Sequence, residues 1–357
     1  MRVSKNSLKG YMLEEVLAYL IRTTGYKLLT DPGQDPRDLA LRGNGLVVKG
    51  RGAVHQVDVL GELKWIPAFT FPLRLILEAK FRKEKTGINV IRNAVAMLLD
   101  VNQNNFPTRE QKPFIPKYQY VCAVFSTSGF SRPAMNLAIA HQISLIDLSG
   151  SEYDDLRTAI ERGATSILES REDSKEIDRR QLISNVRYTI RKHLETLPKS
   201  DDSYETRHSK QLSVLRWQMA DNVLSTAERY HELFVGMANG PFMLLLKADD
   251  PQKFLEYAQN KPVHKIKIKW SPRAENGRRW KIRPTQEPGT YELSFKLPET
   301  LSKWIFDVEK EKVASRAMNV KQRYFSNITI YRYIGDRDHL FRLIFDLEET
   351  ERYAGGR

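Results

Sequence analysis

An acid and a base stand two positions apart near the end of an apolar stretch, residues 73–81, in which most other side chains are hydrophobic. Because side chains in an extended strand alternate between its two faces, Glu78 and Lys80 project side by side, while Leu77 and Ala79 face the opposite way. Charged groups in a buried run are costly unless they are paired or bound to a ligand, and such groups gather at functional sites. Glu78 and Lys80 are therefore candidate catalytic residues.

A second carboxylate, Asp58, lies in the preceding apolar stretch, residues 55–60. A meander of strands between residues 55 and 81 would bring Asp58 beside Glu78. Two carboxylates held together raise each other's pKa unless a cation neutralises them, so their convergence predicts a metal site. Oxygen ligands with room for water and phosphate suit Mg²⁺, with Mn²⁺ as its substitute, and not zinc. Lys80 would then orient or deprotonate the attacking water, or stabilise the charge that develops when a phosphodiester is hydrolysed.

Simpler interpretations stand beside these. Glu78 and Lys80 also fit a cross-strand ion pair on a solvated sheet face, which is worth little energetically. His55 and Asp58 point to opposite faces of a strand over residues 55–60, so we expect His55 to be a structural hydrogen-bonding residue and not a general base. Ser131, two residues before Pro133, is expected to be a helix N-cap.

Hydrophobic periodicity predicts the elements that would position these side chains. A helix over residues 8–24 precedes a loop at 31–36 and strands at 45–49, 55–60 and 73–81. A helix with apolar residues from Ile88 to Leu99, a strand at 120–125, a helix around Met135 and a strand at 144–148 follow. The alternation of strands and helices predicts an α/β domain, a mixed sheet covered by helices, over residues 1–165.

Four segments of this region occur in a characteristic order. Their sequences are Gly10-Tyr-Met-Leu-Glu14, Gly50-Arg-Gly-Ala-Val-His-Gln-Val-Asp58, Leu77-Glu-Ala-Lys80, and Phe125-Ser-Thr-Ser-Gly-Phe-Ser-Arg-Pro-Ala134 followed by Ser144-Leu-Ile-Asp147. In this order they resemble the Mrr-like branch of the PD-(D/E)XK restriction endonucleases, over roughly the first two-fifths of the chain. The resemblance implies an α/β restriction-endonuclease-like core.

The same resemblance implies that Asp58 and Glu78 are metal ligands and that Lys80 is the catalytic lysine. Glu14 would be the acid that the first helix contributes, with its neighbour Glu15 as the alternative. The sequence departs from the family in having Gly-Ala-Val-His-Gln-Val-Asp where Gly-Gly-X-Asp is usual, which leaves the roles of His55 and Gln56 open.

Net charge and composition limit the partners. The chain of 357 residues carries a formal net charge of +13, which attracts a polyanion through phosphate neutralisation and counterion release, so nucleic acid is the expected partner class. Cys122 is the single cysteine, which excludes a disulfide framework and a thiol zinc site. The apolar runs are too short to span a membrane and the first residues lack a leader-like stretch, so we expect no membrane association and a cytoplasmic location.

Two charged helical segments are predicted next, over residues 175–197 and 204–238, as a linker or dimerisation unit over residues 166–239. An apolar stripe runs along the first, at Ile183, Val186, Ile190, Leu194 and Leu197. Such a stripe fits an intramolecular helical hairpin or a dimer seam. We expect a homodimer, because cutting both strands of a duplex generally needs two active sites.

Residues 240–357 are predicted to form a separate α+β domain. A hairpin with a turn at Asn276-Gly277 would gather cations on one face: Lys265, Lys267, Lys269, Lys281 and Arg283. This face fits a DNA phosphate backbone, or simply a lysine-rich sheet edge that discourages aggregation. A protein partner from a defence system is the other expectation for this domain.

Together these patterns predict a Mg²⁺-dependent endonuclease that cleaves double-stranded DNA in restriction or defence, the biological role being implied by the resemblance alone. A structure-specific nuclease acting on junctions or in repair is the alternative within the same chemistry. A non-catalytic DNA-binding or assembly protein on a nuclease-like fold is the alternative outside it.

Overall fold

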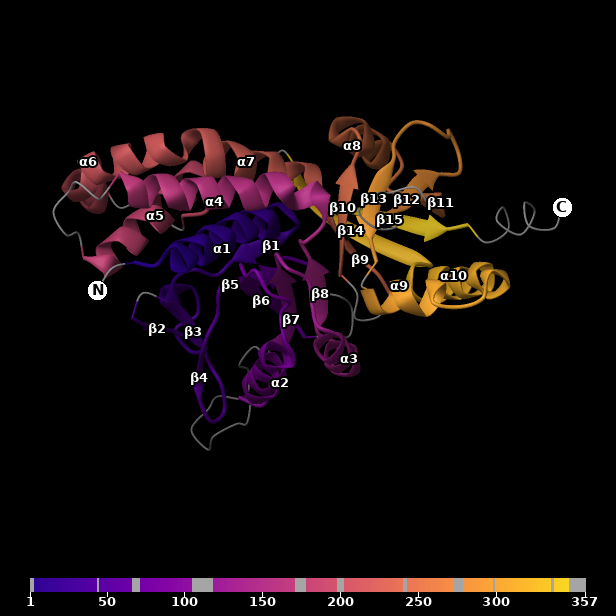
Figure 1. The fold of residues 1–357 in the computed structure, drawn as a ribbon, viewed down its shortest axis with the longest axis horizontal. Coiled ribbons are helices and arrows are strands. Elements are labelled where there is room, and N and C mark those ends of the chain that lie inside the picture. The colour runs from indigo at the N-terminus through magenta and orange to yellow at the C-terminus, as the bar shows by residue number, and fades with distance from the viewer. Residues whose placement is uncertain are drawn as a thin grey trace.

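The structure is a computed structural model that describes residues 3–43, 45–65, 71–104, 118–170, 178–197, 202–239, 243–271, 279–297, 299–334 and 337–346. Its strands form a five-stranded sheet, a three-stranded sheet and a closed barrel, so the chain is mixed α/β (Figure 1). Phe69, the expected break at residues 198–201, Gly240-Pro241, the Asn276-Gly277 turn and Gly335 lie outside the described residues. No described helix is long and apolar enough to cross a membrane.

The five-stranded sheet holds the predicted catalytic strand at its centre. Its order is β1 (Tyr26–Leu28), β5 (Val59–Leu63), β6 (Leu73–Lys80), β7 (Gln119–Ser126) and β8 (Ser144–Asp147). β6, β7 and β8 run parallel, whereas β1 with β5 and β5 with β6 pair antiparallel. The sheet is mixed, as predicted.

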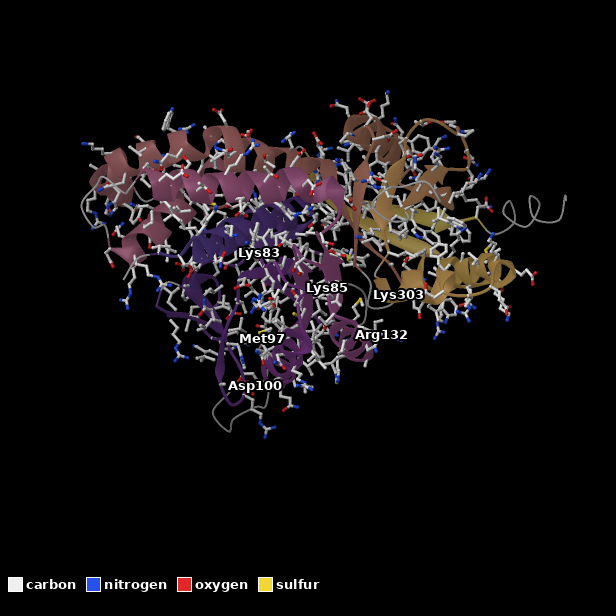
Figure 2. The ribbon with its side chains drawn as sticks, viewed as in Figure 1. Lys83, Lys85, Met97, Asp100, Arg132 and Lys303 are labelled. Carbon is white, nitrogen blue, oxygen red and sulfur yellow. The ribbon has the colours of Figure 1, made fainter. Side chains whose placement is uncertain are left out.

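Helices cover both faces of this sheet. Successive side chains of β6 point alternately to one face and to the other. On one face, Leu75, Leu77 and Ala79 share a core with α1 (Lys5–Thr23). On the other, Ile76 packs with α2 (Ile88–Asn102), which carries Met97 and Asp100 (Figure 2), and with α3 (Arg132–Ala140). Ser131 caps α3 by accepting a hydrogen bond from Ala134, as predicted.

β6 is charged at both ends, and its first half is held by a buried arginine. The Arg74 side chain is 1% exposed and lies 2.7 Å from Asp35 and 2.9 Å from Glu62. It also donates to the Tyr120 hydroxyl at 3.0 Å. Acids on the loop before β2 and on β5 therefore fix the strand at the end opposite to Glu78 and Lys80, because a buried guanidinium needs every one of these partners.

The predicted strand over residues 55–60 is in fact divided between two sheets. β2 (Leu39–Arg42), β3 (Gly45–Lys49) and β4 (Val54–Gln56) form the small antiparallel sheet, which follows a 3₁₀ turn, η1 (Pro32–Gln34). β5 begins at Val59, so Asp58 lies in the break between the strands. There the Asp58 carboxylate accepts a hydrogen bond from the backbone of Ala79 at 2.8 Å, a side-chain bond that replaces the sheet ladder locally.

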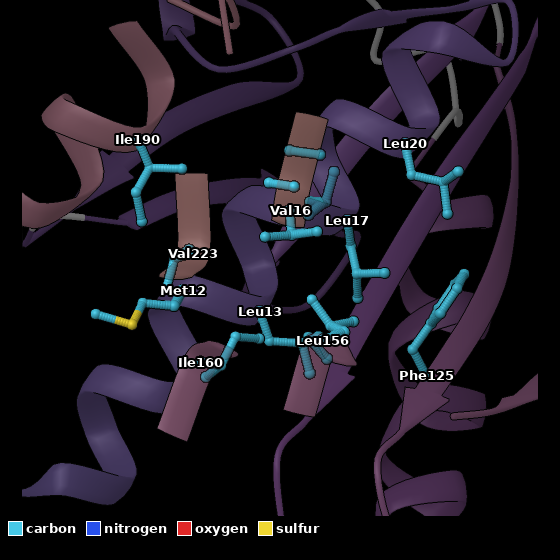
Figure 3. Close-up of a cluster of buried hydrophobic side chains, with 14 of the residues drawn as sticks. Met12, Leu13, Val16, Leu17, Leu20, Phe125, Leu156, Ile160, Ile190 and Val223 are labelled. Carbon is cyan, nitrogen blue, oxygen red and sulfur yellow. The ribbon is translucent and has the colours of Figure 1, made fainter. Parts of the chain in front are cut away.

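The helical layer packs on α1. It consists of η2 (Ser151–Tyr153), α4 (Asp154–Glu169), α5 (Arg179–His193), α6 (Asp202–Met219), the π-helical turn η3 (Ala220–Leu224) and α7 (Ser225–Glu228). Met12 and Leu13 of α1 meet Ile160, Ile190 and Val223, from three elements of this layer, in one core (Figure 3). The boundary expected near residue 165 falls within α4, and the division into domains 1–165, 166–239 and 240–357 stays a prediction.

The apolar stripe of α5 packs against other parts of the same chain. Ile183 and Leu194 are buried, and Val186, Ile190 and Leu194 belong to the same core as α1. The stripe therefore forms an intramolecular contact, while the homodimer stays a prediction. The prediction that the second helical segment extends to residue 238 was wrong at its C-terminal end. After η4 (Arg229–Glu232), residues Leu233–Met237 form strand β9, because this short apolar run completes the barrel.

The C-terminal part forms a closed barrel, which the sequence did not predict beyond an α+β domain. Its order is β10 (Met243–Ala248), β13 (Leu293–Lys296), β12 (Arg279–Pro284), β11 (Val263–Ser271), β15 (Arg337–Phe345), β14 (Asn327–Ile334) and β9. α8 (Pro251–Asn260), α9 (Glu299–Phe306) and α10 (Lys310–Tyr324) accompany it. Its own core contains Phe254, Trp280 and Phe341.

Gly25 joins α1 to β1 at the contact with the barrel. Its φ is +87°, and a Cβ at this position would lie 1.6 Å from Cδ1 of Tyr331 on β14. We predict that Gly25→Ala destabilises the protein, because the left-handed backbone costs about 1–2 kcal/mol and the crowding against the ring costs about 1–3 kcal/mol more. Equilibrium urea unfolding measures the loss.

Gly43→Ala is the matched control. Gly43 also has a positive φ, +61°, but nothing lies within 4 Å of its Cβ position. We expect this variant to show the backbone cost alone. Equal losses in the two variants would contradict the tight packing of Tyr331 against Gly25.

Candidate active site

Asp58, Glu78 and Lys80 meet where β5 begins and β6 ends. Val59 pairs with Leu77, so Asp58, one residue earlier, comes level with Glu78. The Lys80 Nζ lies 3.7 Å from Asp58 Oδ2 and also contacts the Glu78 carboxylate. All three side chains are partly exposed at this end of the sheet. The structure thus brings the three predicted residues together, and their catalytic roles stay a prediction.

The charges at this point act strongly on one another. Burial and the neighbouring Asp58 raise the pKa of Glu78, although Lys80 opposes the shift. Burial would lower the pKa of Lys80, but Asp58 and Glu78 outweigh it and raise that pKa above the ordinary value. Lys80 is therefore a firmly protonated cation in the metal-free protein. This favours charge stabilisation over proton abstraction among the roles considered for it.

α1 places Glu14 and Glu15 in different surroundings. Glu14 lies 3.1 Å from Arg187 and is close enough to Asp58 and Lys80 for their charges to act on it. Burial raises the pKa of Glu14 to about 8, and Asp58 adds to the rise while Arg187 opposes it. Of the two acids, Glu14 is thus the one beside the catalytic candidates.

Glu15 is structural. It is fully buried and its two oxygens lie 2.6 Å from Arg187 Nε and 2.7 Å from Arg191 Nε. Burial alone would raise the pKa of Glu15, but the guanidiniums of Arg191 and Arg187 lower it below its usual value. Glu15 therefore stays ionised inside the core and joins α1 to α5.

Arg187 and Arg191 are residues of this site that the sequence analysis missed. They line a cavity of about 140 Å³ together with Glu15, Gln56 and Asp58. Their spacing of four residues places both on one face of α5, but a pair of arginines on a charged helix is too common to mark a site. Nothing in the local sequence connects them to an acid on a helix more than 150 residues earlier.

His55 does not contribute to the cluster. Its Nε2 lies 2.7 Å from Asp100 Oδ2 on α2, and the same carboxylate accepts hydrogen bonds from the backbone of Gly52 and Ala53. His55 is thus a hydrogen-bonding residue on β4, as predicted.

The donor set fits Mg²⁺ better than a metal enclosed wholly by protein. Among the described residues, no group of three or more histidine, cysteine, aspartate or glutamate side chains could hold a metal ion. The site offers the two carboxylates of Asp58 and Glu78. Mg²⁺ is commonly held by one or two carboxylates, with water and substrate phosphate completing its shell.

The basic hairpin is folded as predicted, but its cations are largely engaged. Ile266, Ile268, Trp280 and Ile282 are buried, which leaves the opposite face of β11 and β12 to the cations. Lys265 lies 3.5 Å from Asp346, Lys281 lies 2.5 Å from Glu292, and Arg283 contacts the same glutamate. Acids directly before β13 and directly after β15 thus neutralise part of this face.

Comparisons with known proteins give weak results. No protein-family model matches the sequence, and no curated protein matches it. Among solved structures, a protein of unknown function, AF1548, has 17% identity and a TM-score of 0.32, over 62% of this chain and 97% of that one. MspJI restriction endonuclease in complex with a 27-mer oligonucleotide has 14% identity and a TM-score of 0.24, over 49% of this chain and 35% of that one. Such low TM-scores carry no argument about fold or activity.

The opposite pKa shifts of Glu14 and Glu15 predict opposite effects of pH on the stability of the protein. The folded-state pKa of Glu14 is raised from 4.5 to about 8, so its contribution is fully present below pH 4.5 and is lost as the pH rises through about 8. Glu14→Gln removes this titration. We therefore predict that, in metal-free buffer, the variant gains stability relative to the wild type between pH 4.5 and about 8, as measured by urea unfolding at a series of pH values.

Glu15→Gln is the control, with the opposite sign. The pKa of Glu15 is lowered, so its contribution is present above its ordinary pKa and is lost as the pH falls through the folded-state value. We expect this variant to be destabilised at neutral pH by about 3–5 kcal/mol, the cost of breaking a buried ion pair, and less at acid pH. Parallel pH profiles for the two variants would overturn the assignment of Glu14 and Glu15.

Proposed function

We propose that this chain is a Mg²⁺-dependent endonuclease that hydrolyses phosphodiester bonds in duplex DNA, on a restriction-endonuclease-like core. The observation that supports the proposal best is the placement of one lysine, Lys80, between the carboxylates of Asp58 and Glu78 at the exposed end of an otherwise buried strand. Two acids and a cation in this arrangement are what phosphodiester hydrolysis requires. The net charge of +13 supports a polyanionic substrate.

In this proposal Asp58 and Glu78 hold the metal, which supplies Lewis acidity to the phosphate and an acidified water. The backbone amide of Ala79 fixes the orientation of Asp58 through its hydrogen bond of 2.8 Å. Lys80, which contacts both carboxylates, offsets the negative charge that develops on the scissile phosphate. Glu14, which lies 3.1 Å from Arg187, is the acid that α1 contributes beside Asp58 and Lys80.

Restriction or defence against foreign DNA is the role we propose, from the order of the four segments that resemble Mrr-like endonucleases. Neither the recognised sequence nor a base modification follows from the site. Supercoiled, linear, methylated and branched duplexes, each with and without Mg²⁺, are therefore the substrates for the first cleavage assays. A preference for branched DNA would move the proposal to junction or repair cleavage by the same residues.

The first test removes the proposed chemistry with minimal change of shape. We predict that Asp58→Asn, Glu78→Gln and Lys80→Met each lower the rate of Mg²⁺-dependent cleavage by at least about 100-fold, the cost of losing one preorganised electrostatic group. Binding to DNA should persist, because affinity comes mainly from phosphate contacts elsewhere. Gel assays of plasmid cleavage and fluorescence anisotropy measure the two properties.

Glu256→Gln is the matched control. Glu256 is an exposed carboxylate on α8, which packs against β10 and β15 of the barrel and not against the central sheet. This variant should cleave like the wild type. Wild-type rates in any of the three site variants would contradict the assignment of that residue.

The proposed homodimer has its own test. One active site cuts one strand, so we predict that a dimer linearises plasmid and that a monomer only nicks it. Light scattering of the free protein and of its DNA complex, combined with the ratio of nicked to linear product, measures this. A strict monomer that linearises plasmid in single encounters would contradict the model of two cooperating copies.

A further inference from the structure

The loop that follows the catalytic strand is firmly anchored. It comprises residues 81–87 and lies against residues 126–131, the loop before α3. Its hydrogen bonds are Arg82 N to Thr127 Oγ1 at 3.1 Å, Thr127 Oγ1 to Arg82 O at 3.3 Å, Ser128 Oγ to Glu84 O at 2.5 Å, Thr86 N to Gly129 O at 2.9 Å and Ser131 N to Thr86 O at 3.0 Å. Every second residue of the loop is thus tied down, which fixes its backbone before any ligand binds.

This anchored loop presents a run of cations. Arg82, Lys83 and Lys85 are exposed, with the exposed Glu84 as the one acid among them. Among the described residues, no ion pair joins Arg82 or Lys83 to a carboxylate within 4.0 Å. The loop therefore carries a surplus of positive charge on a fixed backbone.

Two further cations lie on neighbouring elements. Arg132 is exposed at the start of α3, and the bridge between Thr86 and Phe130 places α3 beside the loop. Lys303 is exposed on α9, which packs against α3. Figure 2 labels Lys83 and Lys85 over the central sheet, and Arg132 and Lys303 nearer the barrel. We call Arg82, Lys83, Lys85, Arg132 and Lys303 the cationic loop surface.

The cationic loop surface begins at the candidate active site. Arg82 is two residues beyond Lys80, in the loop that continues from β6. An extended chain covers at most roughly 3.6 Å per residue, so Lys83 lies within about 11 Å of Lys80. Since one strand of DNA rises about 3.4 Å per phosphate, that distance corresponds to about three phosphates.

The hairpin predicted to bind DNA is less suited to this task. A phosphate could reach Lys281 or Arg283 only by displacing Glu292, and Lys265 only by displacing Asp346. Exchanging one anion for another gains little and releases fewer counterions. The hairpin also lies on the barrel, while the cationic loop surface continues directly from β6.

We propose that the cationic loop surface contacts the phosphate backbone of duplex DNA and directs the duplex to Asp58, Glu78 and Lys80. The choice of duplex DNA as the ligand rests on the proposed nuclease function. It assigns the salt-dependent part of DNA affinity to the anchored loop and its neighbours, and not to the hairpin of β11 and β12.

The experiment compares two triple variants with the same change of charge. Lys83→Gln/Lys85→Gln/Arg132→Gln removes cations from the cationic loop surface, and Lys265→Gln/Lys281→Gln/Arg283→Gln removes them from the hairpin. Anisotropy titrations with a fluorescent 30-bp duplex, in EDTA and at several salt concentrations, give log K against log salt for the full-length proteins. EDTA separates binding from cleavage, so a failure of the nuclease proposal leaves this measurement intact.

For the loop variant we expect DNA binding to weaken by the same factor for duplexes of unrelated sequence. The slope of log K against log salt should become shallower by about 0.9 per lost phosphate contact, and so by about 2.7 for the three substitutions. The hairpin variant should keep the wild-type slope. Lys83→Arg/Lys85→Arg, which keeps the charge, should bind like the wild type. Circular dichroism and thermal melting check that these exposed substitutions leave the fold unchanged.

An unchanged slope in the loop variant, or a loss confined to the hairpin variant, would overturn the proposal. Equal losses in both variants would also overturn it, because they would reflect net charge and not a located surface. A wild-type protein that binds duplex RNA but no duplex DNA would overturn both this inference and the proposed substrate. Intact binding in the loop variant together with lost cleavage in Lys80→Met would reject the surface alone.

Discussion

The ion pairs that Glu15 makes with Arg187 and Arg191 hold together two parts of the chain that lie far apart in sequence. A carboxylate without these guanidiniums would be too costly to bury, and the guanidiniums would be equally costly without the carboxylate. Because Arg187 also contacts Glu14, the same interaction fixes the face of α1 that meets Asp58 and Lys80. The helical layer therefore contributes Arg187 and Arg191 to the lining of the candidate site.

The features that follow from local periodicity were predictable. The two faces of β6, the burial of Cys122 and the capping of α3 by Ser131 all depend on residues close together in the sequence. The break between β4 and β5 was not, because the Asp58 carboxylate at the break accepts its hydrogen bond from the backbone of Ala79, 21 residues later. Arg187 and Arg191 were missed for the same reason, since their acid partners lie on α1.

The basic hairpin shows how a correct pattern leads to an incomplete conclusion. Alternation predicted which side chains are buried and which are exposed, and Ile266, Ile268 and Trp280 are indeed in the barrel core. The count of charges along the hairpin could not include Glu292, which joins from the neighbouring part of the barrel. Conversely, residues 82–85 read as an ordinary charged turn until their backbone bonds to Thr127 and Ser128 are known.

The barrel can close only after its last strand in the sequence has been synthesised on the ribosome. β15 is the strand that lies between β11 and β14, so these two keep open edges until residues Arg337–Phe345 have been synthesised. The central sheet needs nothing beyond β8 for its strand pairing, and it emerges first. The strands of the central sheet can therefore pair before the barrel closes, and until then the open edges of β11 and β14 are the surfaces most exposed to aggregation.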